Sequence, residues 1–227
     1  MKAYCFLSAV PMRKEPSDRS EMVNQLIYGD TFVVVERQER WSYVRCDYDG
    51  YEGWVDNLQW KDADGDIQPL LGEEPLVQID TTVQQTPDAV ALKYLDVPYL
   101  WGGRTKMGLD CSGLTQVCFK HLGINLLRDA SQQVTQGEEV AMLSLALPSD
   151  LLFFKAHKGG DMERHQLYGT DIVPTHVGIL MEGGRVIHAS GRVRIDAVDE
   201  LGIYNKEQER YTHELVAIRR VPFKKTK

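Results

Sequence analysis

The chain has 227 residues, enough for one large domain or two small domains with a buried core. Its composition, 43% hydrophobic and 26% charged, is that of a globular protein, and no apolar run reaches the ~20 residues that a membrane-spanning helix needs. The formal net charge of −7 disfavours nucleic acid, teichoic acid and anionic membrane surfaces as main partners.

The N-terminal segment contains an apolar run from Ala3 to Val10 behind a lysine, a pattern that partly imitates a signal peptide. Ser8 interrupts the run, and no small-residue cleavage site follows before Arg13. We therefore interpret the segment as the first strand of a folded domain and expect the protein to reside in the cytoplasm.

Residues 1–60 have the pattern of a small all-β domain. Short runs rich in β-branched and aromatic residues, such as Thr31–Glu36 and Trp41–Cys46, are separated by turns that contain Gly29 and Gly50. About five short strands in about 60 residues predict a small barrel.

Three features of this region resemble a bacterial SH3-like domain. They are Gly29-Asp30 before the central strand, Trp41 at the start of the next strand, and the run YEGWV from Tyr51 to Val55. Only one such domain is visible. Residues 61–85 have a mixed composition, and we interpret them as a linker or as extra strands.

From residue 86 the pattern changes to helices. Pro87 suits a first helical turn, and apolar residues follow it at helical spacing up to Leu95. A second helix is expected to begin at Cys111, with Asp110 as its N-cap and Gly123 at its C′ position.

Beyond Asp150 the chain contains four strand-like runs, DLLFF, THVGILM, RVIHAS and ELVAIRRV. Helices followed by antiparallel strands indicate an α+β domain, which we assign to residues 86–227.

The four cysteines show neither a metal-binding spacing nor the density of a disulfide scaffold. Cys5 and Cys46 lie in strand-like runs and Cys118 on the apolar face of the second helix, so packing explains them. Cys111 differs, because a thiol at a helix N-terminus meets the positive end of the helix dipole and free N–H groups, which lower its pKa. From this segment alone, a reactive thiol and a small buried side chain both remain open.

Two of the six histidines, His176 and His188, lie in buried-looking strands joined by the hairpin signal EGGR at 182–185. A two-residue turn would put their rings on opposite faces of the hairpin. A three-residue loop would pair Gly178 with His188 and place the two histidines on one face, roughly 7–8 Å apart as diagonal neighbours. We predict the three-residue loop, or a bulge of equal effect, because Gly178 leaves room for the His188 ring.

The other histidines have simpler explanations. His121 lies near the end of the second helix, where a cation suits the dipole, and is predicted to be structural. His213 precedes the final strand and carries no signal. A polar loop, 155–173, holds the remaining two with an aspartate (His157, His165 and Asp161), and we interpret it as a solvated loop or pocket wall rather than a metal site. We expect no metal and no cofactor.

Six motifs follow one another in the second region: PYLWGG (Pro98–Gly103), GLDCSGL (Gly108–Leu114), LLRDAS (Leu126–Ser131), SDLLFF (Ser149–Phe154), THVGI (Thr175–Ile179) and IHAS (Ile187–Ser190). Together they resemble the NlpC-type cysteine peptidase family, which implies a papain-like fold and action on peptidoglycan stem peptides. With the preceding domain, the chain is similar to γ-D-glutamyl-L-diamino acid endopeptidases that recycle murein peptides. We therefore expect an α+β, papain-like cysteine peptidase domain preceded by a small SH3-like β-barrel.

The resemblance implies a catalytic set. Cys111 would be the nucleophile, His176 the base and His188 the third residue that orients it. The backbone N–H of Cys111 and the phenol of Tyr99 would stabilise the oxyanion, where loss of one donor typically costs ~2.7–4 kcal/mol of barrier.

The resemblance also implies a substrate-binding set. Asp110 would bind the free amino group of an N-terminal L-alanine, helped by Tyr51 and Glu15 from the SH3-like domain, with Glu21 as the alternative to Glu15. Two serines would contact the D-glutamyl α-carboxylate or nearby backbone (Ser112 and Ser131), and a helix cap is the alternative for the second.

An anionic pocket beside the thiol would reject an acylated N-terminus, because an unpaired buried carboxylate costs several kcal/mol. We therefore predict hydrolysis of the γ-D-glutamyl–meso-diaminopimelate bond in released murein peptides, through an acyl-enzyme on Cys111. The alternatives are a secreted hydrolase of intact wall, a non-catalytic SH3-like wall-peptide binding protein, and acyl transfer or amide hydrolysis on a lipid or small molecule.

Overall fold

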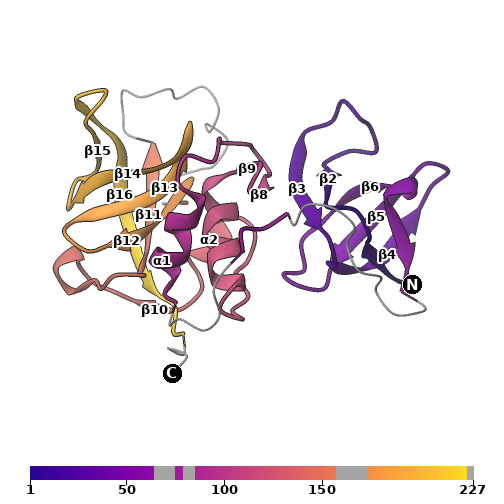
Figure 1. The fold of residues 1–227 in the computed structure, drawn as a ribbon, viewed down its shortest axis with the longest axis horizontal. Coiled ribbons are helices and arrows are strands. Elements are labelled where there is room, and N and C mark those ends of the chain that lie inside the picture. Colours follow the sequence, from indigo (N-terminus) through magenta and orange to yellow (C-terminus); the bar gives the residue numbers. More distant parts are fainter. Residues whose placement is uncertain (64–74, 79–84, 157–172, 224–227) are drawn as a thin grey trace.

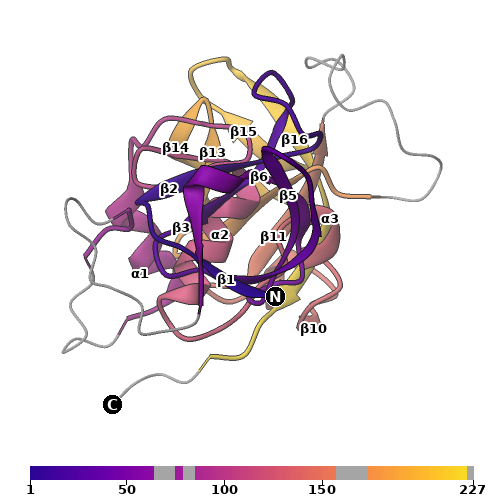
Figure 2. The ribbon, with the colours of Figure 1, turned by 90° about the vertical axis from the view of Figure 1, so that its right-hand side faces the viewer.

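The protein is described by a computed structural model that covers residues 1–63, 75–78, 85–156 and 173–223. It consists of two lobes placed side by side along the long axis (Figure 1). When the molecule is viewed along that axis, the first lobe lies in front of the second (Figure 2). No helix in these described ranges is long and apolar enough to cross a membrane.

The first lobe is a sheet of seven antiparallel strands in the order β3-β2-β6-β5-β4-β1-β7. The strands are β1 (Lys2–Cys5), β2 (Ala9–Arg13), β3 (Met22–Ile27), β4 (Thr31–Arg37), β5 (Trp41–Cys46), β6 (Glu52–Asp56) and β7 (Trp60–Asp62). A 3-10 turn, Asn57–Gln59, precedes the last of them. The expected turns at Gly29 and Gly50 are present, with φ of 82° and 72°.

The core of this lobe forms because alternate strand residues point inward. Phe32, Val44 and Val55 are fully buried there, and Cys5 and Cys46 pack into the same cluster. The packing roles predicted for these two cysteines are therefore confirmed.

The second lobe combines short helices with a second antiparallel sheet. Its helices are α1 (Pro87–Ala91), α2 (Cys111–Lys120) and α3 (Ala130–Gln133), with 3-10 turns at Leu92–Tyr94 and Leu143–Leu145. Its strands are β8 (Arg104–Thr105), β9 (Gly108–Leu109), β10 (Glu138–Glu139), β11 (Leu151–Ala156), β12 (His176–Met181), β13 (Arg185–Ser190), β14 (Arg192–Asp199), β15 (Gly202–Asn205) and β16 (Arg210–Arg220).

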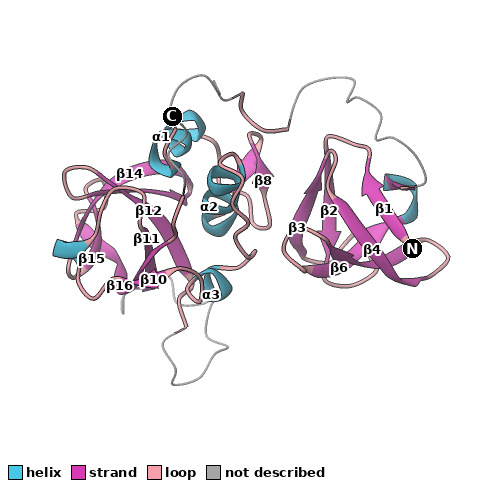
Figure 3. Ribbon diagram, turned by 90° about the horizontal axis from the view of Figure 1, so that it is seen from below, coloured by secondary structure: helices cyan, strands magenta, loops and turns pink. Residues whose placement is uncertain are grey.

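The main sheet runs β10-β16-β11-β12-β13-β14-β15, and an additional pairing of β15 with β16 closes its six long strands into a barrel. Helices α1 and α2 lie between this sheet and the first lobe (Figure 3). Buried residues of α2, Cys118 among them, pack against β12 and β13 in the largest apolar cluster. The predicted α+β class, with an SH3-like lobe and a papain-like lobe, is confirmed.

Local signals fix the helix ends. The Asp110 side chain accepts the Gly113 N–H and caps α2, as predicted. Gly123, with φ of 74°, lies two residues beyond the C-cap of α2 rather than at C′. Helix α1 begins at Pro87 as expected but tightens to a 3-10 turn at Leu92, earlier than the apolar spacing indicates.

Candidate active site

Cys111 is the first residue of α2, and the loop before it is shaped for that position. The Asp110 carboxylate accepts the Gly113 N–H at 2.6 Å and the Gly102 N–H at 2.8 Å, which ties the helix start to the preceding loop. A Cβ on Gly113 would lie 2.2 Å from the Gly103 carbonyl oxygen, so the close approach of loop and helix requires glycine at 113.

The Cys111 thiol is shielded, with only 7% of the residue exposed. Burial and the Asp110 charge raise its pKa to about 12, although backbone N–H groups of Val177 and Ser112 act in the opposite direction. The backbone N–H at the helix start thus lowers the thiol pKa as expected, but burial and Asp110 outweigh it. A neutral thiol needs a base at the moment of reaction. The Val177 backbone contacts the sulfur of Cys111, so the thiol lies against the start of β12, one residue from His176.

The hairpin of β12 and β13 brings the two predicted histidines together. Met181 pairs with Arg185 and Gly178 with His188, so the predicted three-residue loop is confirmed. His176 Nε2 lies 2.8 Å from His188 Nδ1 with the ring planes nearly perpendicular, at 87°. This hydrogen bond occupies Nε2 of His176.

A carboxylate continues this line of hydrogen bonds. His188 Nε2 lies 3.0 Å from Asp196 Oδ2, and Arg194 donates to both oxygens of Asp196 at 2.7 and 2.9 Å. Neither Asp196 nor Arg194 was among the site residues predicted from the sequence. The available signal was the alternation RVRID at 192–196, which puts both side chains on one face of the strand next to the histidine strand.

His213 also belongs to this cluster, contrary to expectation. It lies inside β16 rather than before it, and its ring stacks on His176 with centroids 4.2 Å apart. Burial, together with His188, lowers the pKa of His213 to about 3, so this ring is neutral. Nothing in the local sequence indicates the contact, because it depends on how the sheet closes.

His121 has the structural role predicted for it, but not as a cation. Its Nε2 lies 3.0 Å from the Tyr94 hydroxyl, and burial lowers its pKa. Tyr99, the predicted second oxyanion donor, is half-buried, and its backbone N–H donates to the Gly191 carbonyl at 3.0 Å. A bridge to Leu109 places it beside the strand that leads into Cys111.

A cleft of about 700 Å³ opens beside Cys111 and is lined by both lobes. Of the predicted substrate-binding residues, Tyr51, Asp110, Ser112 and Ser131 line it. The remaining lining residues are Lys14, Glu21, Val23, Tyr43, Glu52, Gly53, Trp101, Asp129, Ala130, Val173, Pro174 and Thr175.

Glu15 is not part of this lining. It is exposed, and the first-lobe carboxylate nearest in sequence that reaches the cleft is Glu21, which accepts the Trp101 indole N–H at 2.8 Å. The cleft lining therefore favours the alternative, Glu21, and the role of either carboxylate in binding stays a prediction. The choice depends on how the β2–β3 loop meets the second lobe, which a local motif does not encode.

Asp110 reaches the cleft but is already neutralised. Arg128, 1% exposed, donates from Nη1 to Asp110 Oδ1 at 3.0 Å and from Nη2 to Oδ2. The same guanidinium donates to Ser112 Oγ at 3.0 Å and to Asn24 of the first lobe at 2.8 Å. Both Asp110 oxygens thus already have donors within the protein, and its role as an ammonium ligand stays a prediction.

Asp129 is the half-buried carboxylate that the cleft offers instead. Burial raises its pKa, although Arg128 and the Tyr51 phenol of the first lobe act against the rise. Asp129 is also the N-cap of α3, where its backbone N–H donates to Gln132 Oε1 at 3.0 Å.

Ser131 is the second residue of α3, so the helix-cap alternative for it is wrong. Its exposed side chain lines the cleft.

The sequence profile of the NlpC/P60 family matches residues 96–214, just over half of the chain. The chain belongs to the NlpC/P60 family. Its peptidases are cysteine peptidases, in keeping with a thiol that lines the cleft and paired histidines on the β12–β13 hairpin. A second profile, of the bacterial dipeptidyl-peptidase SH3 domain, matches residues 12–59.

Individual relatives agree with this membership. The chain is 36% identical to dipeptidyl-peptidase 6 of Lysinibacillus sphaericus, covering 69% of this chain and 83% of that protein. It is 33% identical to the γ-D-glutamyl-L-lysine dipeptidyl-peptidase of Bacillus subtilis, over 56% of this chain and 37% of that protein. The chain spans less than two fifths of the length of three of the curated relatives that it matches.

A solved structure shares the fold over the whole chain. It is a NlpC/P60 family protein from Bacillus cereus, with a TM-score of 0.72, 19% identity, and coverage of 97% of this chain and 99% of that one. At this identity the likeness shows the two-lobed fold alone.

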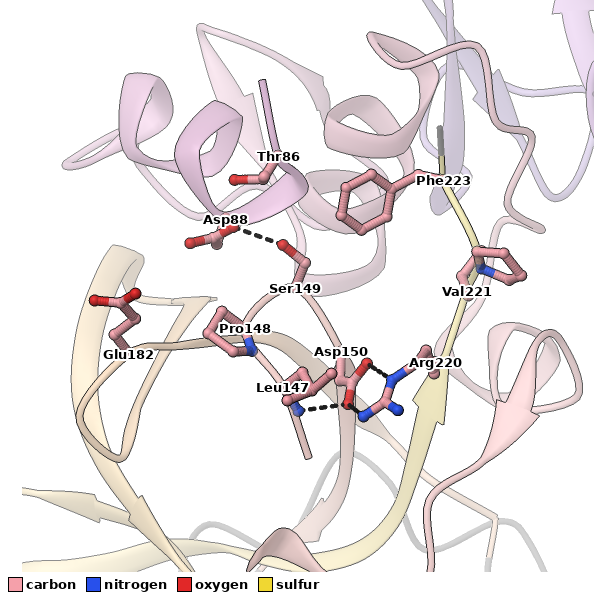
Figure 4. Close-up of a pocket in the computed structure, with 11 residues that line it drawn as sticks. Thr86, Asp88, Leu147, Pro148, Ser149, Asp150, Glu182, Arg220, Val221 and Phe223 are labelled. Atoms are coloured by element: carbon pink, nitrogen blue, oxygen red, sulfur yellow. Dashed lines mark hydrogen bonds and ion pairs between the residues drawn. The ribbon is translucent and has the colours of Figure 1, made fainter. Parts of the chain in front are cut away.

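A second cavity, of about 550 Å³, shares no lining residue with the cleft of this NlpC/P60 chain. Its polar groups pair with one another: the Arg220 guanidinium faces Asp150 at 2.7 and 2.9 Å, and Ser149 donates to Asp88 at 2.6 Å (Figure 4). These pairs join α1, the start of β11 and the end of β16, so the cavity is a structural junction.

Within the described ranges, no cluster of three or more His, Cys, Asp or Glu side chains has the arrangement of a metal site. The histidines considered for such a site, His157 and His165, lie with Asp161 outside the described residues.

Proposed function

We propose that this NlpC/P60 chain is a cysteine endopeptidase that hydrolyses the γ-D-glutamyl–meso-diaminopimelate bond of released murein peptides with a free N-terminal L-alanine. The observation that carries the proposal is a cleft lined by Cys111 together with Asp129 and Tyr51, which come from different lobes and interact electrostatically. A peptide whose N-terminus is bound by these two residues would present the γ-carbonyl group of its second residue to the thiol.

The charge of Asp129 supports a cationic ligand. Its raised pKa means that the surroundings compensate the ionised carboxylate only in part. An α-ammonium group would supply the missing positive charge and donate hydrogen bonds. An acylated N-terminus would instead leave the desolvated carboxylate unpaired, which disfavours binding of intact wall.

The residues around the thiol account for both halves of the reaction. As Cys111 Sγ attacks the γ-carbonyl carbon, its proton passes to His176 Nδ1, a C–S bond forms, and the carbonyl electrons move to oxygen. The Cys111 N–H and the Tyr99 phenol donate to this oxyanion. Collapse breaks the C–N bond, and the leaving amine takes the proton from His176.

Hydrolysis of the thioester then restores the protein. His176 removes a proton from water as the water oxygen attacks the acyl carbon, the C–S bond breaks, and the sulfur recovers the proton. The released product is L-Ala-D-Glu. Because burial raises the pKa of the resting thiol, His176 has to take the thiol proton during the reaction, which makes the position of His176 decisive.

The test is to incubate the protein with L-Ala-γ-D-Glu-meso-diaminopimelate and with its N-acetyl derivative, and to follow L-Ala-D-Glu by mass spectrometry. We expect cleavage of the free peptide only, and none by Cys111→Ala. Asp129→Asn should lower kcat/KM for the free peptide by about 10–100-fold, since a charge-assisted contact worth about 1.5–3 kcal/mol is lost.

Glu52→Gln is the matched control, because Glu52 is another cleft carboxylate but is exposed and bonded to Tyr43. It should leave kcat/KM nearly unchanged. Cleavage of isolated sacculi without product from the tripeptide would overturn the proposal in favour of a wall hydrolase. Binding of the peptide without turnover, unchanged in Cys111→Ala, would indicate a non-catalytic binding protein.

A further inference from the structure

The proposed reaction requires Nδ1 of His176 to be unprotonated. The hydrogen bonds that link His176 to His188 and His188 to Asp196 determine whether it is. We infer that Asp196 is a positioning residue that sets the tautomers of both His188 and His176, so that Nδ1 of His176 is the unprotonated, basic nitrogen. The catalytic consequence rests on the proposed function, whereas the tautomers can be measured without any substrate.

The tautomers follow from the acceptor at the far end of the line. An ionised carboxylate only accepts hydrogen bonds, so Asp196 Oδ2, 3.0 Å from His188 Nε2, requires a proton on that nitrogen. A neutral His188 then has a bare Nδ1, which accepts. His176 Nε2, 2.8 Å from that Nδ1, must therefore carry a proton. In a neutral His176 ring the other nitrogen, Nδ1, is then unprotonated.

The surroundings keep Asp196 ionised. Arg194 binds both carboxylate oxygens at 2.7 and 2.9 Å and is itself bound by Glu207 at 3.0 Å. Burial opposes ionisation of Asp196, but the hydrogen bonds from His188 and Arg194 outweigh it and hold its pKa below the ordinary value.

The surroundings also keep His188 neutral. The residue is 1% exposed, and burial lowers its pKa although Asp196 acts in the opposite direction. The stacked ring of His213 is neutral as well, with a pKa of about 3. His188 therefore carries one proton, which is the condition for its tautomer to be fixed from the Asp196 end.

Asp196→Asn removes the negative charge of the carboxylate and keeps the size of the side chain. An asparagine can turn its NH₂ group toward His188 Nε2, which forces the proton of His188 onto Nδ1. That proton then points at His176 Nε2, so the His176 proton moves to Nδ1 and the base is lost. The opposite amide orientation keeps the original tautomers, so we expect a mixed population in the variant.

The experiment is long-range ¹H–¹⁵N NMR of protein with ¹⁵N-labelled histidine rings near neutral pH, with His176 assigned by comparison with His176→Gln. In the wild type we expect the His176 Nδ1 shift of an unprotonated nitrogen. In Asp196→Asn we expect a substantial shift toward the protonated value. We also expect kcat for the tripeptide to fall about 10–100-fold with KM nearly unchanged, by analogy with the carboxylates that orient metal-bound histidines.

Glu207→Gln is the matched control, because it makes the same acid-to-amide change at an exposed residue. Glu207 contacts Arg194, the partner of Asp196, and does not contact His176 or His188 directly. It should move neither the His176 shift nor kcat. If Nδ1 of His176 is protonated in the wild type, the inference is overturned whether or not the variant folds. An unchanged His176 tautomer in Asp196→Asn would also overturn it. If the tautomers behave as expected but the tripeptide is not cleaved, the proposed function fails and the role of Asp196 stands.

Discussion

At the scale of single residues, the imidazole of His213 shows how packing sets the charge of a side chain. It stacks on His176 at 4.2 Å and has Phe154 at 6.4 Å on an edge-on approach. An imidazolium there would face the positive charge that His176 acquires during the proposed reaction. A depressed pKa of about 3 removes that conflict, because His213 stays neutral while its neighbour is protonated.

This pKa also predicts a pH dependence of stability. The folded-state pKa of His213 lies below its ordinary value of 6.5, so between pH 6.5 and about 3 the unfolded chain binds the proton and the folded protein does not. Stability must therefore fall as the pH drops below 6.5. The side chain is half-buried, so solvent screens part of the effect, and we expect about 1 kcal/mol between about pH 7 and pH 5.

His213→Phe tests this contribution, since phenylalanine keeps the ring stack and cannot titrate. Urea unfolding at both pH values should show a smaller loss of the free energy of unfolding in the variant than in the wild type. Equal losses in the two proteins would mean that other groups cause the acid sensitivity. His121→Phe is the comparison, because burial also lowers the pKa of that ring, which contacts Tyr94 rather than His176.

At the scale of elements, the β12–β13 hairpin depends on the missing side chain at Gly178. A Cβ there would lie 2.5 Å from Val186 Cγ2 and 3.0 Å from His188 Cβ, too close on both sides. Gly178→Ala should destabilise the protein by about 1–3 kcal/mol and displace the His188 ring, lowering kcat in the tripeptide assay. Val186→Ala in the same chain removes one clash, so the double variant should regain part of the stability in urea unfolding. A fully stable, fully active Gly178→Ala would contradict this account.

The same hairpin shows what the sequence can predict and why. Its register was predictable because a glycine opposite a histidine, a short loop and strand alternation all act within a few residues. The start of α2 was predictable for the same reason, since Asp110 caps it through a contact three residues away.

The site residues that were missed or misassigned depend on distant parts of the chain. Asp110 carries the right charge beside the nucleophile, but Arg128, distant in sequence, neutralises it and leaves Asp129 facing the cleft. His213 reaches His176 only because β16 closes the sheet. A side chain's charge can be read locally, whereas its partner is known only once the fold is known.

At the scale of the whole molecule, buried charges hold the two lobes together. Asp30 of the first lobe accepts from Arg104 at 3.1 Å and from Lys120 at 2.7 Å in the second. The ring of Tyr48 contacts both cations, 5.7 and 4.6 Å from its centroid. A Cβ on Gly102 would lie 2.6 Å from the Met22 carbonyl oxygen, so the backbones of the two lobes also meet closely. The cleft needs walls from both lobes, and this interface keeps them in place.

The interface predicts that the two lobes unfold together and that Asp30→Asn uncouples them. The variant leaves Arg104, 1% exposed, without its counter-charge, which should cost about 3–5 kcal/mol, while Lys120 can turn to solvent. Burial opposes ionisation of Asp30, but Arg104 and Lys120 hold its pKa below the ordinary value, so this contribution is present at neutral pH and is lost as the pH falls through the folded-state pKa.

Urea unfolding measured by tryptophan fluorescence and by far-UV circular dichroism should give coincident transitions in the wild type and separate ones in Asp30→Asn. KM for the tripeptide should rise in the variant, because Tyr51 and Asp129 come from different lobes and no longer hold their relative positions. Asp47→Asn is the control: this surface carboxylate contacts Lys2 at 3.7 Å within the first lobe, and its loss should change stability by less than about 0.5 kcal/mol. Separate transitions already in the wild type would show that the lobes are only loosely joined and that the ion pairs across the interface do not set the walls of the cleft.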